Sequence, residues 1–166
     1  VVESCKIIMD AGVDFLWFPT PNFGGYCISR KTYEKCISES NIHALARIKE
    51  NGAKIVLHTC GLYDDRFDLV LKESGDVWHI SDTSTKKIKE EYGDKVSLMG
   101  SIPCVPVLME GTEQEVYDFC YKECMDAARD GRFILSGDCD VPPGTSDENM
   151  KAAVRAAKEA EKVLFQ

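Results

Sequence analysis

Short apolar runs alternate with longer amphipathic segments along the 166 residues of the chain. The runs are rich in β-branched and aromatic residues, and each follows a turn that contains Gly or Asp. Short apolar runs between such turns predict buried strands. We expect five strands, at residues 15–18, 55–57, 77–80, 96–99 and 133–135.

The segments between these runs carry apolar residues at the 3.6-residue spacing of amphipathic helices. Thr112 followed by Glu115 predicts a capping box that opens one helix, and Ser146 is placed to open the last helix. We expect helices at roughly 30–50, 62–73, 83–92, 112–129 and 146–164.

The order of these elements indicates an α/β fold. Strands that are apolar throughout, each followed by a helix, favour a parallel sheet covered by helices. An open doubly wound sheet and a (β/α)₈ TIM barrel both fit this pattern, but about five βα units cannot close a barrel of about 250 residues. A barrel would therefore be represented by its C-terminal part. No linker or repeat divides the sequence, so we expect a single domain over 1–166 within a longer polypeptide.

Composition narrows the classes of function. The net charge is −8 and the pI is near 4.9, without a basic stripe, which argues against partners such as nucleic acid or an anionic membrane. No apolar stretch approaches the roughly 20 residues of a membrane span. The eight cysteines are scattered rather than spaced as a disulfide framework. Without a secretory signal, we expect a cytoplasmic location.

His58, Cys60 and Cys139 stand where apolar runs stop and Gly-containing turns begin. The carboxyl ends of parallel strands share one edge of a sheet, where α/β folds place their sites. An imidazole and two thiolates suit zinc, and three protein ligands leave a fourth position open for a substrate. The alternative is a core histidine with buried cysteines.

Five motifs across nearly the whole chain resemble the uroporphyrinogen decarboxylase superfamily. The resemblance is closest to its zinc-dependent, corrinoid-linked methyltransferase branch, typified by methylcobalamin:coenzyme M methyltransferases. It corresponds to the C-terminal half of a family member and implies a (β/α)₈ barrel. The motifs are LHTCG at 57–61, LMGSI at 98–102, EGTEQEV at 110–116, FILSGDC at 133–139 and PPGTSDEN at 142–149.

The resemblance implies that His58, Cys60 and Cys139 hold zinc. The zinc would activate the sulfur or oxygen of a small thiol or methylated small molecule. The methyl partner would be methylcobalamin on a separate corrinoid protein, as in methanogenesis or O-demethylation. The metal-free decarboxylases of the superfamily carry a Gly-His-Gly-type turn where this chain has Gly137-Asp138-Cys139, which disfavours tetrapyrrole decarboxylation.

Two loops depart from the family pattern, and three further residues are candidates for the site. The departures are at 100–106 and at 19–21, and both affect the substrate assignment. Asp82 is a candidate fourth zinc ligand, with helix capping as its alternative. Cys104 and His79 are candidate substrate-binding residues, and a core position is the alternative for His79.

Some residues that could carry chemistry are better explained by packing. Cys120 and Cys124 lie one helical turn apart and are expected to pack in the core. Trp17 and Trp78 are expected to be core aromatics, and His43 a helix surface residue. The alternative hypothesis is that the chain is a non-catalytic barrel fragment that assembles with another chain. A partial barrel exposes strand edges and apolar surface, so it would pair with another copy or with a missing N-terminal half.

Overall fold

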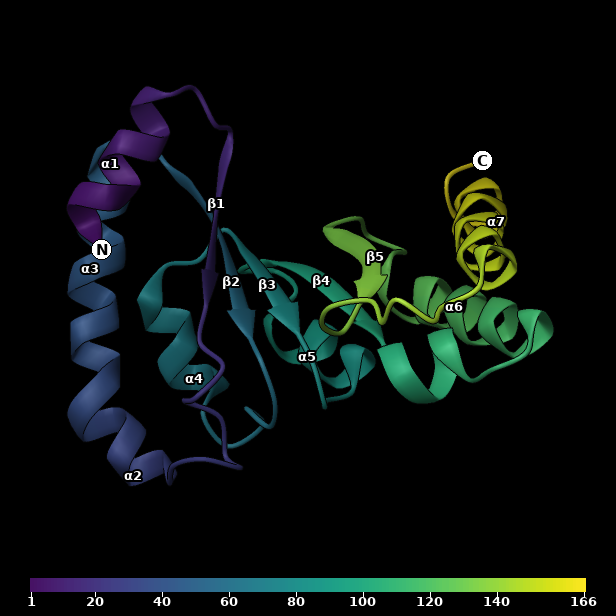
Figure 1. The fold of residues 1–166 in the computed structure, drawn as a ribbon, viewed down its shortest axis with the longest axis horizontal. Coiled ribbons are helices and arrows are strands. Elements are labelled where there is room, and N and C mark those ends of the chain that lie inside the picture. The colour runs from purple at the N-terminus through teal and green to yellow at the C-terminus, as the bar shows by residue number, and fades with distance from the viewer. The chain divides into compact units, whose positions relative to one another are not determined.

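The computed structural model describes all of residues 1–166, with five strands and seven α-helices that alternate along the chain (Figure 1). The elements form two compact units, unit 1 at Val1–His79 and unit 2 at Ile80–Gln166. The prediction of a single domain over 1–166 stays a prediction. The α-helices and strands are α1 (Val2–Asp10), β1 (Phe15–Pro19), α2 (Arg30–Tyr33), α3 (Glu39–Glu50), β2 (Lys54–Thr59), α4 (Phe67–Val70), β3 (Val77–Ile80), α5 (Thr85–Tyr92), β4 (Ser97–Ile102), α6 (Glu113–Ala127), β5 (Phe133–Gly137) and α7 (Asp147–Leu164).

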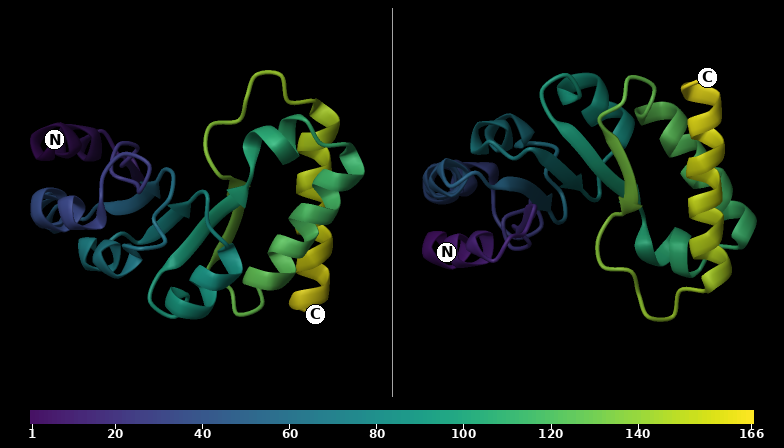
Figure 2. Two further views of the ribbon diagram at one scale, coloured as in Figure 1. Left: turned by 90° about the horizontal axis from the view of Figure 1, so that it is seen from below. Right: turned by 90° about the horizontal axis from the view of Figure 1, so that it is seen from above.

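In unit 1, β1 and β2 pair in parallel, with Phe15 opposite Lys54 and Pro19 opposite His58. One face of these strands carries buried apolar side chains such as Leu16, Ile55 and Leu57. The helices α1, α3 and α4 lie on one side of the strands (Figure 2). Between α2 and α3 the helix passes through a π-helical segment, η1 (Glu34–Ser38).

Unit 2 places two helices beside the parallel pair β4 and β5, in which Leu98 lies opposite Phe133 and Ile102 opposite Gly137. The helices α6 and α7 run alongside each other (Figure 2). Small residues along α7, Ala152 and Ala156, are fully buried and let the two helices approach closely. Cys120, on the facing side of α6, is buried in the same apolar cluster.

The helix starts follow the predicted side-chain caps. Thr112 accepts a hydrogen bond from the Glu115 N–H, and the Glu115 carboxylate accepts one from the Thr112 N–H, so the predicted capping box is confirmed. Ser146 caps α7 by accepting from the N–H of Asn149 at 3.2 Å. The Asn149 side-chain amide also donates to the carbonyls of Leu108 and Gly111, which ties the start of α7 to the preceding loop.

Among the element boundaries that differ from the predictions, two have a clear cause in the tertiary structure. The helix predicted from residue 62 begins only at Phe67, because tertiary hydrogen bonds take up residues 62–66: the Leu62 carbonyl accepts from Gly25, and the Tyr63 hydroxyl donates to Thr20. The strand predicted at 96–99 runs from Ser97 to Ile102, because its pairing with β5 continues to the end of that strand. The following residues form a π-helical segment, η3 (Cys104–Met109), that the pattern did not predict.

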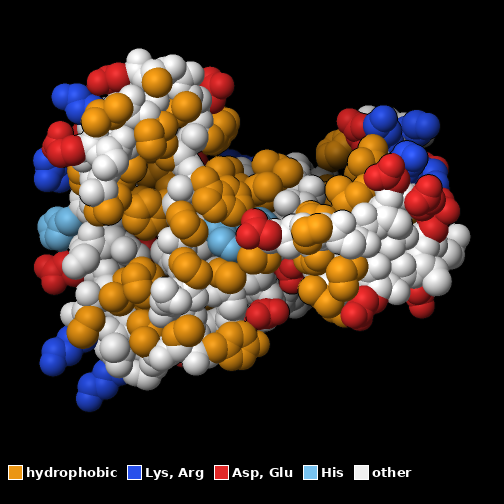
Figure 3. Space-filling view, viewed as in Figure 1, with side chains coloured by type: hydrophobic (Ala, Val, Ile, Leu, Met, Phe, Trp, Pro, Cys, Tyr) orange, Lys and Arg blue, Asp and Glu red, His pale blue; other side chains and the backbone are white.

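The tryptophans are buried to very different extents. Trp78 is fully buried, as predicted, but the prediction that Trp17 is a core aromatic is wrong, since 49% of it is exposed. Trp17 and Phe15 lie on the face of β1 opposite to buried Leu16. Figure 3 shows hydrophobic side chains gathered over this part of unit 1 and charged side chains over α7. None of the helices combines the length and hydrophobicity that a membrane crossing requires.

Candidate metal centre

The carboxyl end of β2 carries two of the three candidate ligands. His58 is the penultimate residue of the strand and Cys60 follows its last residue. Since side chains alternate along a strand, His58 and Cys60 are directed to the same face. His58 is 5% exposed and Cys60 is half-buried. Gly61 then turns the chain with φ of +90°, a conformation that favours glycine.

The backbone of His58 is held by the loop after β1. The N–H and the hydroxyl of Thr20 both donate to the carbonyl of His58, each at 2.9 Å. The Tyr63 hydroxyl donates to the Thr20 carbonyl at 2.7 Å. Burial raises the pKa of Tyr63, so this phenol stays protonated and keeps its donor. These bonds fix the main chain of His58 relative to β1.

The imidazole of His58 packs against two other rings. Its centroid lies 5.2 Å from that of Trp17 and 4.5 Å from that of His79, in both cases with nearly stacked planes. His79, a candidate substrate-binding residue, is 2% exposed, and its carbonyl accepts from the Thr59 hydroxyl at 3.2 Å. The structure therefore brings His79 against a candidate ligand, while its contact with a substrate stays a prediction.

A glycine pair lets the loop after β1 approach the turn that follows Cys60. A Cβ atom on Gly24 would lie 3.1 Å from the Cys60 carbonyl oxygen, closer than side chains normally come. The neighbouring Gly25 N–H donates to the Leu62 carbonyl at 2.6 Å. Arg66, 1% exposed, secures the same loop by donating to the carbonyls of Phe23 and Ile28. Sequence reasoning missed this packing, although the adjacent glycines were a usable signal.

The third candidate ligand, Cys139, is an exposed residue in the turn after β5. A main-chain hydrogen bond holds this turn: the Asp138 N–H donates to the Ile102 carbonyl at 2.9 Å. The N–H of Cys104 donates to the Asp138 carboxylate at 3.0 Å, and its thiol donates to the Cys139 carbonyl at 3.4 Å. Burial raises the pKa of the Cys104 thiol and keeps it a donor. Cys104 thus contacts the turn itself, and its predicted substrate contact stays a prediction.

Asp82, the candidate fourth ligand, is exposed and lies two residues beyond β3, in the left-handed region with φ of +49°. The alternative that Asp82 caps the next helix is wrong. Ser84 caps α5 instead, with its hydroxyl accepting from the Lys87 N–H at 3.3 Å. The cap sits at Ser84 because the helix begins at Thr85 rather than near Thr83. Ligation by Asp82 stays a prediction.

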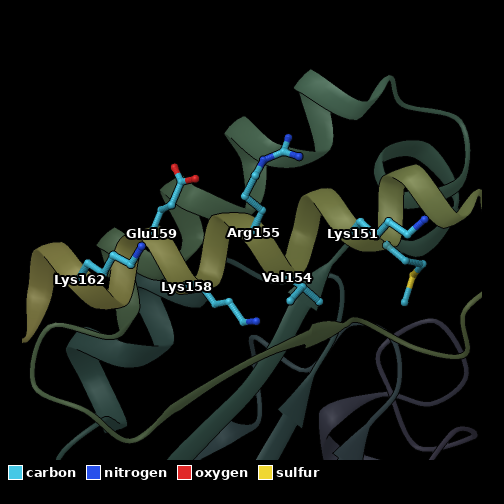
Figure 4. Close-up of a pocket in the computed structure, with 7 residues that line it drawn as sticks. Lys151, Val154, Arg155, Lys158, Glu159 and Lys162 are labelled. Atoms are coloured by element: carbon cyan, nitrogen blue, oxygen red, sulfur yellow. The ribbon is translucent and has the colours of Figure 1, made fainter.

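Unit 2 also contains several hollows. One of about 490 Å³ lies along α7 and is lined mainly by charged side chains that include Lys151, Arg155 and Lys158 (Figure 4). It offers no imidazole or thiol to a metal. The second hollow, of about 470 Å³, is apolar and includes Gly137 and Val141, which flank the Cys139 turn.

Parallel βα units with imidazole and thiol donors at strand ends define the class as an α/β barrel protein with candidate metal ligands. The chain belongs to the uroporphyrinogen decarboxylase (URO-D) family, whose model matches residues 1–160. The methylated-thiol--coenzyme M methyltransferase of Methanosarcina mazei is 30% identical over 162 residues, which are 96% of this chain and 41% of that protein. This chain therefore spans about two fifths of the length of that relative.

A solved structure supports the fold. A methyltransferase from Methanosarcina mazei superposes with a TM-score of 0.83 at 20% identity, over 95% of this chain and 47% of that one. The predicted fold class, part of a (β/α)₈ barrel with five parallel strands, is confirmed. The resemblance to the methyltransferase branch, matched in the C-terminal part of the relative, is confirmed as well.

Proposed function

We propose that this chain is part of a zinc-dependent methyltransferase that moves a methyl group between a protein-bound corrinoid and a small thiol or methylated compound. One observation carries the proposal: His58 and Cys60 occupy one face at the carboxyl end of β2, in a chain related to a methyltransferase. Carboxyl ends of barrel strands are where enzymes of this architecture hold their reactive groups.

The donors of this chain fit zinc. His58 offers an imidazole nitrogen, and Cys60 and Cys139 each offer a sulfur. We propose that Cys139 joins the β2 pair as the third ligand. Two thiolates and one imidazole leave a fourth tetrahedral position for a substrate or for Asp82. When bound, zinc would deprotonate a substrate thiol whose pKa is otherwise near 8.5.

The remaining residues would position these donors. Thr20 and Tyr63 hold the main chain of His58, and Cys104 holds the main chain of Cys139. A methylated corrinoid, when bound, would supply the methyl group and would keep the electron pair of the bond that it loses. The substrate sulfur held at His58, Cys60 and Cys139 would form the new bond to the methyl carbon, and the thiol proton would be released.

We further propose that the methyl partner is a corrinoid carried by a separate protein. The relative acts, by its name, on methylated thiols and coenzyme M, which supports a small thiol as one substrate class here. Because the chain covers two fifths of that relative, the rest of the barrel would come from further polypeptide, either joined to this chain or supplied as a separate subunit.

A decarboxylase of tetrapyrroles is the second candidate, since the family takes its name from that activity. The chain has Gly137-Asp138-Cys139 where the sequence comparison above expects a Gly-His-Gly-type turn, and a thiol there favours metal binding. Metal content separates the two candidates, because the decarboxylase requires no zinc.

The first experiment is elemental analysis of the protein purified without added metal. We expect near-stoichiometric zinc in the unaltered protein, and its loss in Cys60→Ala. Cys36→Ala is the matched control, because this exposed cysteine lies in η1, outside the candidate ligand set. Zinc retained in Cys60→Ala, or absent from the unaltered protein, would contradict the metal site. A zinc-loaded protein would then be assayed for thiol-dependent demethylation of methylcobalamin.

A further inference from the structure

Three aromatic rings in unit 1 form a compact group, here called the ring cluster: Trp17, His58 and His79. Their centroids are separated by 5.2 Å between Trp17 and His58, 4.5 Å between His58 and His79, and 4.9 Å between Trp17 and His79. The nearly equal separations describe a triangle, so each ring contacts both of the others.

Trp17 is much more exposed to solvent than the two histidines with which it packs. The two histidines are 5% and 2% exposed, whereas 49% of Trp17 is accessible to solvent. An indole that serves only to fill a core is usually buried much more completely. Trp17 makes ring contacts with both imidazoles.

Hydrogen bonds hold the main chain of His58, and ring contacts bear on the plane of its imidazole. Thr20 donates twice to the carbonyl of His58, which holds its main chain. The χ2 torsion of histidine is broad, so a fixed main chain does not by itself set the plane of the ring. The Trp17 indole lies at 30° to the imidazole plane and therefore restricts rotation about χ2.

We propose that Trp17 is a positioning residue of the metal centre. By stacking on the His58 imidazole, together with His79, it sets the plane in which His58 presents its nitrogen to the metal. This inference rests on the zinc site of the proposed function. Groups that orient a metal-ligating histidine typically change metal affinity by about 10- to 100-fold when they are removed.

The test replaces zinc by Co²⁺, whose absorption bands report ligand geometry, and compares three variants with the unaltered protein. We expect Trp17→Ala to bind Co²⁺ about tenfold more weakly, with shifted bands, because the His58 ring loses one of the two rings that stack on it. Trp17→Phe should restore the bands, since a phenyl ring still stacks. Phe15→Ala is the matched control, because Phe15 is on the same strand and face, is 56% exposed and makes no ring contact with His58.

The outcomes separate this inference from the proposed function. An unaltered protein that binds no Co²⁺ overturns both. Binding by the unaltered protein with an identical affinity and spectrum in Trp17→Ala overturns the role of Trp17 alone. If circular dichroism shows that Trp17→Ala does not fold, the inference is tested by the fluorescence of Trp78→Phe, in which Trp17 is the remaining tryptophan. Co²⁺ binding should quench the emission of Trp17, and unchanged emission on binding would overturn the inference.

Discussion

Unit 1 buries more polar and charged side chains than unit 2. In unit 1 the buried residues include several that are polar and hydrogen-bonded, among them Thr20, Arg66 and Glu73. In unit 2 the cluster between α6 and α7 is apolar and contains small residues such as Cys120 and Ala156. In both units hydrogen bonds hold the main chain at a candidate ligand, through Thr20 at His58 and through Cys104 at Cys139, but His58 is buried whereas Cys139 is exposed.

The polar interior of unit 1 contains a buried carboxyl group, Glu73, whose pKa is shifted toward neutral pH. The carboxylate of Glu73 accepts hydrogen bonds from the Tyr33 hydroxyl and from the Asn41 amide, the latter at 3.0 Å. Burial nevertheless outweighs these bonds and raises the pKa of Glu73 to about 7. In unit 2 burial raises the pKa of Glu123, on α6, as well.

The largest expected effect comes from removing one ligand in each unit. Cys60→Ala and Cys139→Ala should each lower zinc affinity by more than about 100-fold, because losing groups that only orient a ligand already costs about 10- to 100-fold. Competition with a chromophoric chelator measures both affinities. Without metal, the free energy of unfolding of Cys139→Ala should differ from that of the unaltered protein by no more than about 0.5 kcal/mol, since the Cys139 side chain is exposed. If only one of the two variants loses zinc, the cysteine replaced in the other variant is not a zinc ligand.

The next largest effect is the pH dependence of stability from Glu73. Its pKa is raised from 4.5 in the unfolded chain to about 7 in the folded protein, so the folded state binds the proton more tightly. The contribution of Glu73 to the free energy of unfolding is complete below about pH 4.5 and is lost as the pH rises to about 7. The free energy of unfolding falls over this range by up to about 1.4 kcal/mol per pH unit. Urea unfolding from pH 4.5 to 8 measures it.

Glu73→Gln is the variant that isolates this effect, because it removes the titration and keeps an oxygen that can accept from Tyr33. The free energy of unfolding of this variant should fall less steeply between pH 4.5 and 7 than that of the unaltered protein. Glu90→Gln, an exposed position on α5, is the control and should leave the slope unchanged. Parallel pH profiles for Glu73→Gln and the unaltered protein would show that burial of Glu73 does not tune the stability of unit 1.

A smaller effect is expected from the bonds behind His58. Tyr63→Phe removes the hydroxyl that donates to the Thr20 carbonyl, and should lower the free energy of unfolding by about 1–2 kcal/mol. Zinc affinity should fall as well, because Thr20 in turn holds His58. Tyr26→Phe is the control, since Tyr26 is 72% exposed. A destabilised Tyr63→Phe with unchanged zinc affinity would mean that these bonds serve unit 1 but not its ligands.

The fold was largely predictable because its signals are local. Apolar runs marked all five strands, and Thr112 with Glu115 marked the start of α6 from four consecutive residues. Trp17 was mispredicted because an aromatic residue in a short apolar strand was taken to be buried, whereas its face of β1 is open. The start of α4 was missed because Tyr63 is held by a residue 43 positions earlier.

The candidate ligands could be predicted from the sequence, but the residues that position them could not. His58, Cys60 and Cys139 could be selected from the sequence because each is a metal-binding residue type at the end of an apolar run. Thr20 could not, since its role depends on a bond to His58 across 38 positions. The thiol of Cys104 contacts Cys139 across 35 positions, which no short motif encodes. Donors are recognisable locally, but the residues that orient them depend on tertiary structure.

The smallest expected effect concerns Asp82, which would add a carboxylate from unit 2 to the ligand set. Asp and Asn both tolerate the left-handed backbone at φ of +49°, so Asp82→Asn removes the negative charge without straining the chain. We expect zinc affinity to fall by about tenfold or less, because a substrate must be able to displace this ligand. Asp82→Ala should show the same loss of affinity together with about 1 kcal/mol of backbone strain. If Asp82→Asn binds zinc like the unaltered protein and only Asp82→Ala differs, Asp82 shapes the turn after β3, and unit 2 contributes Cys139 alone.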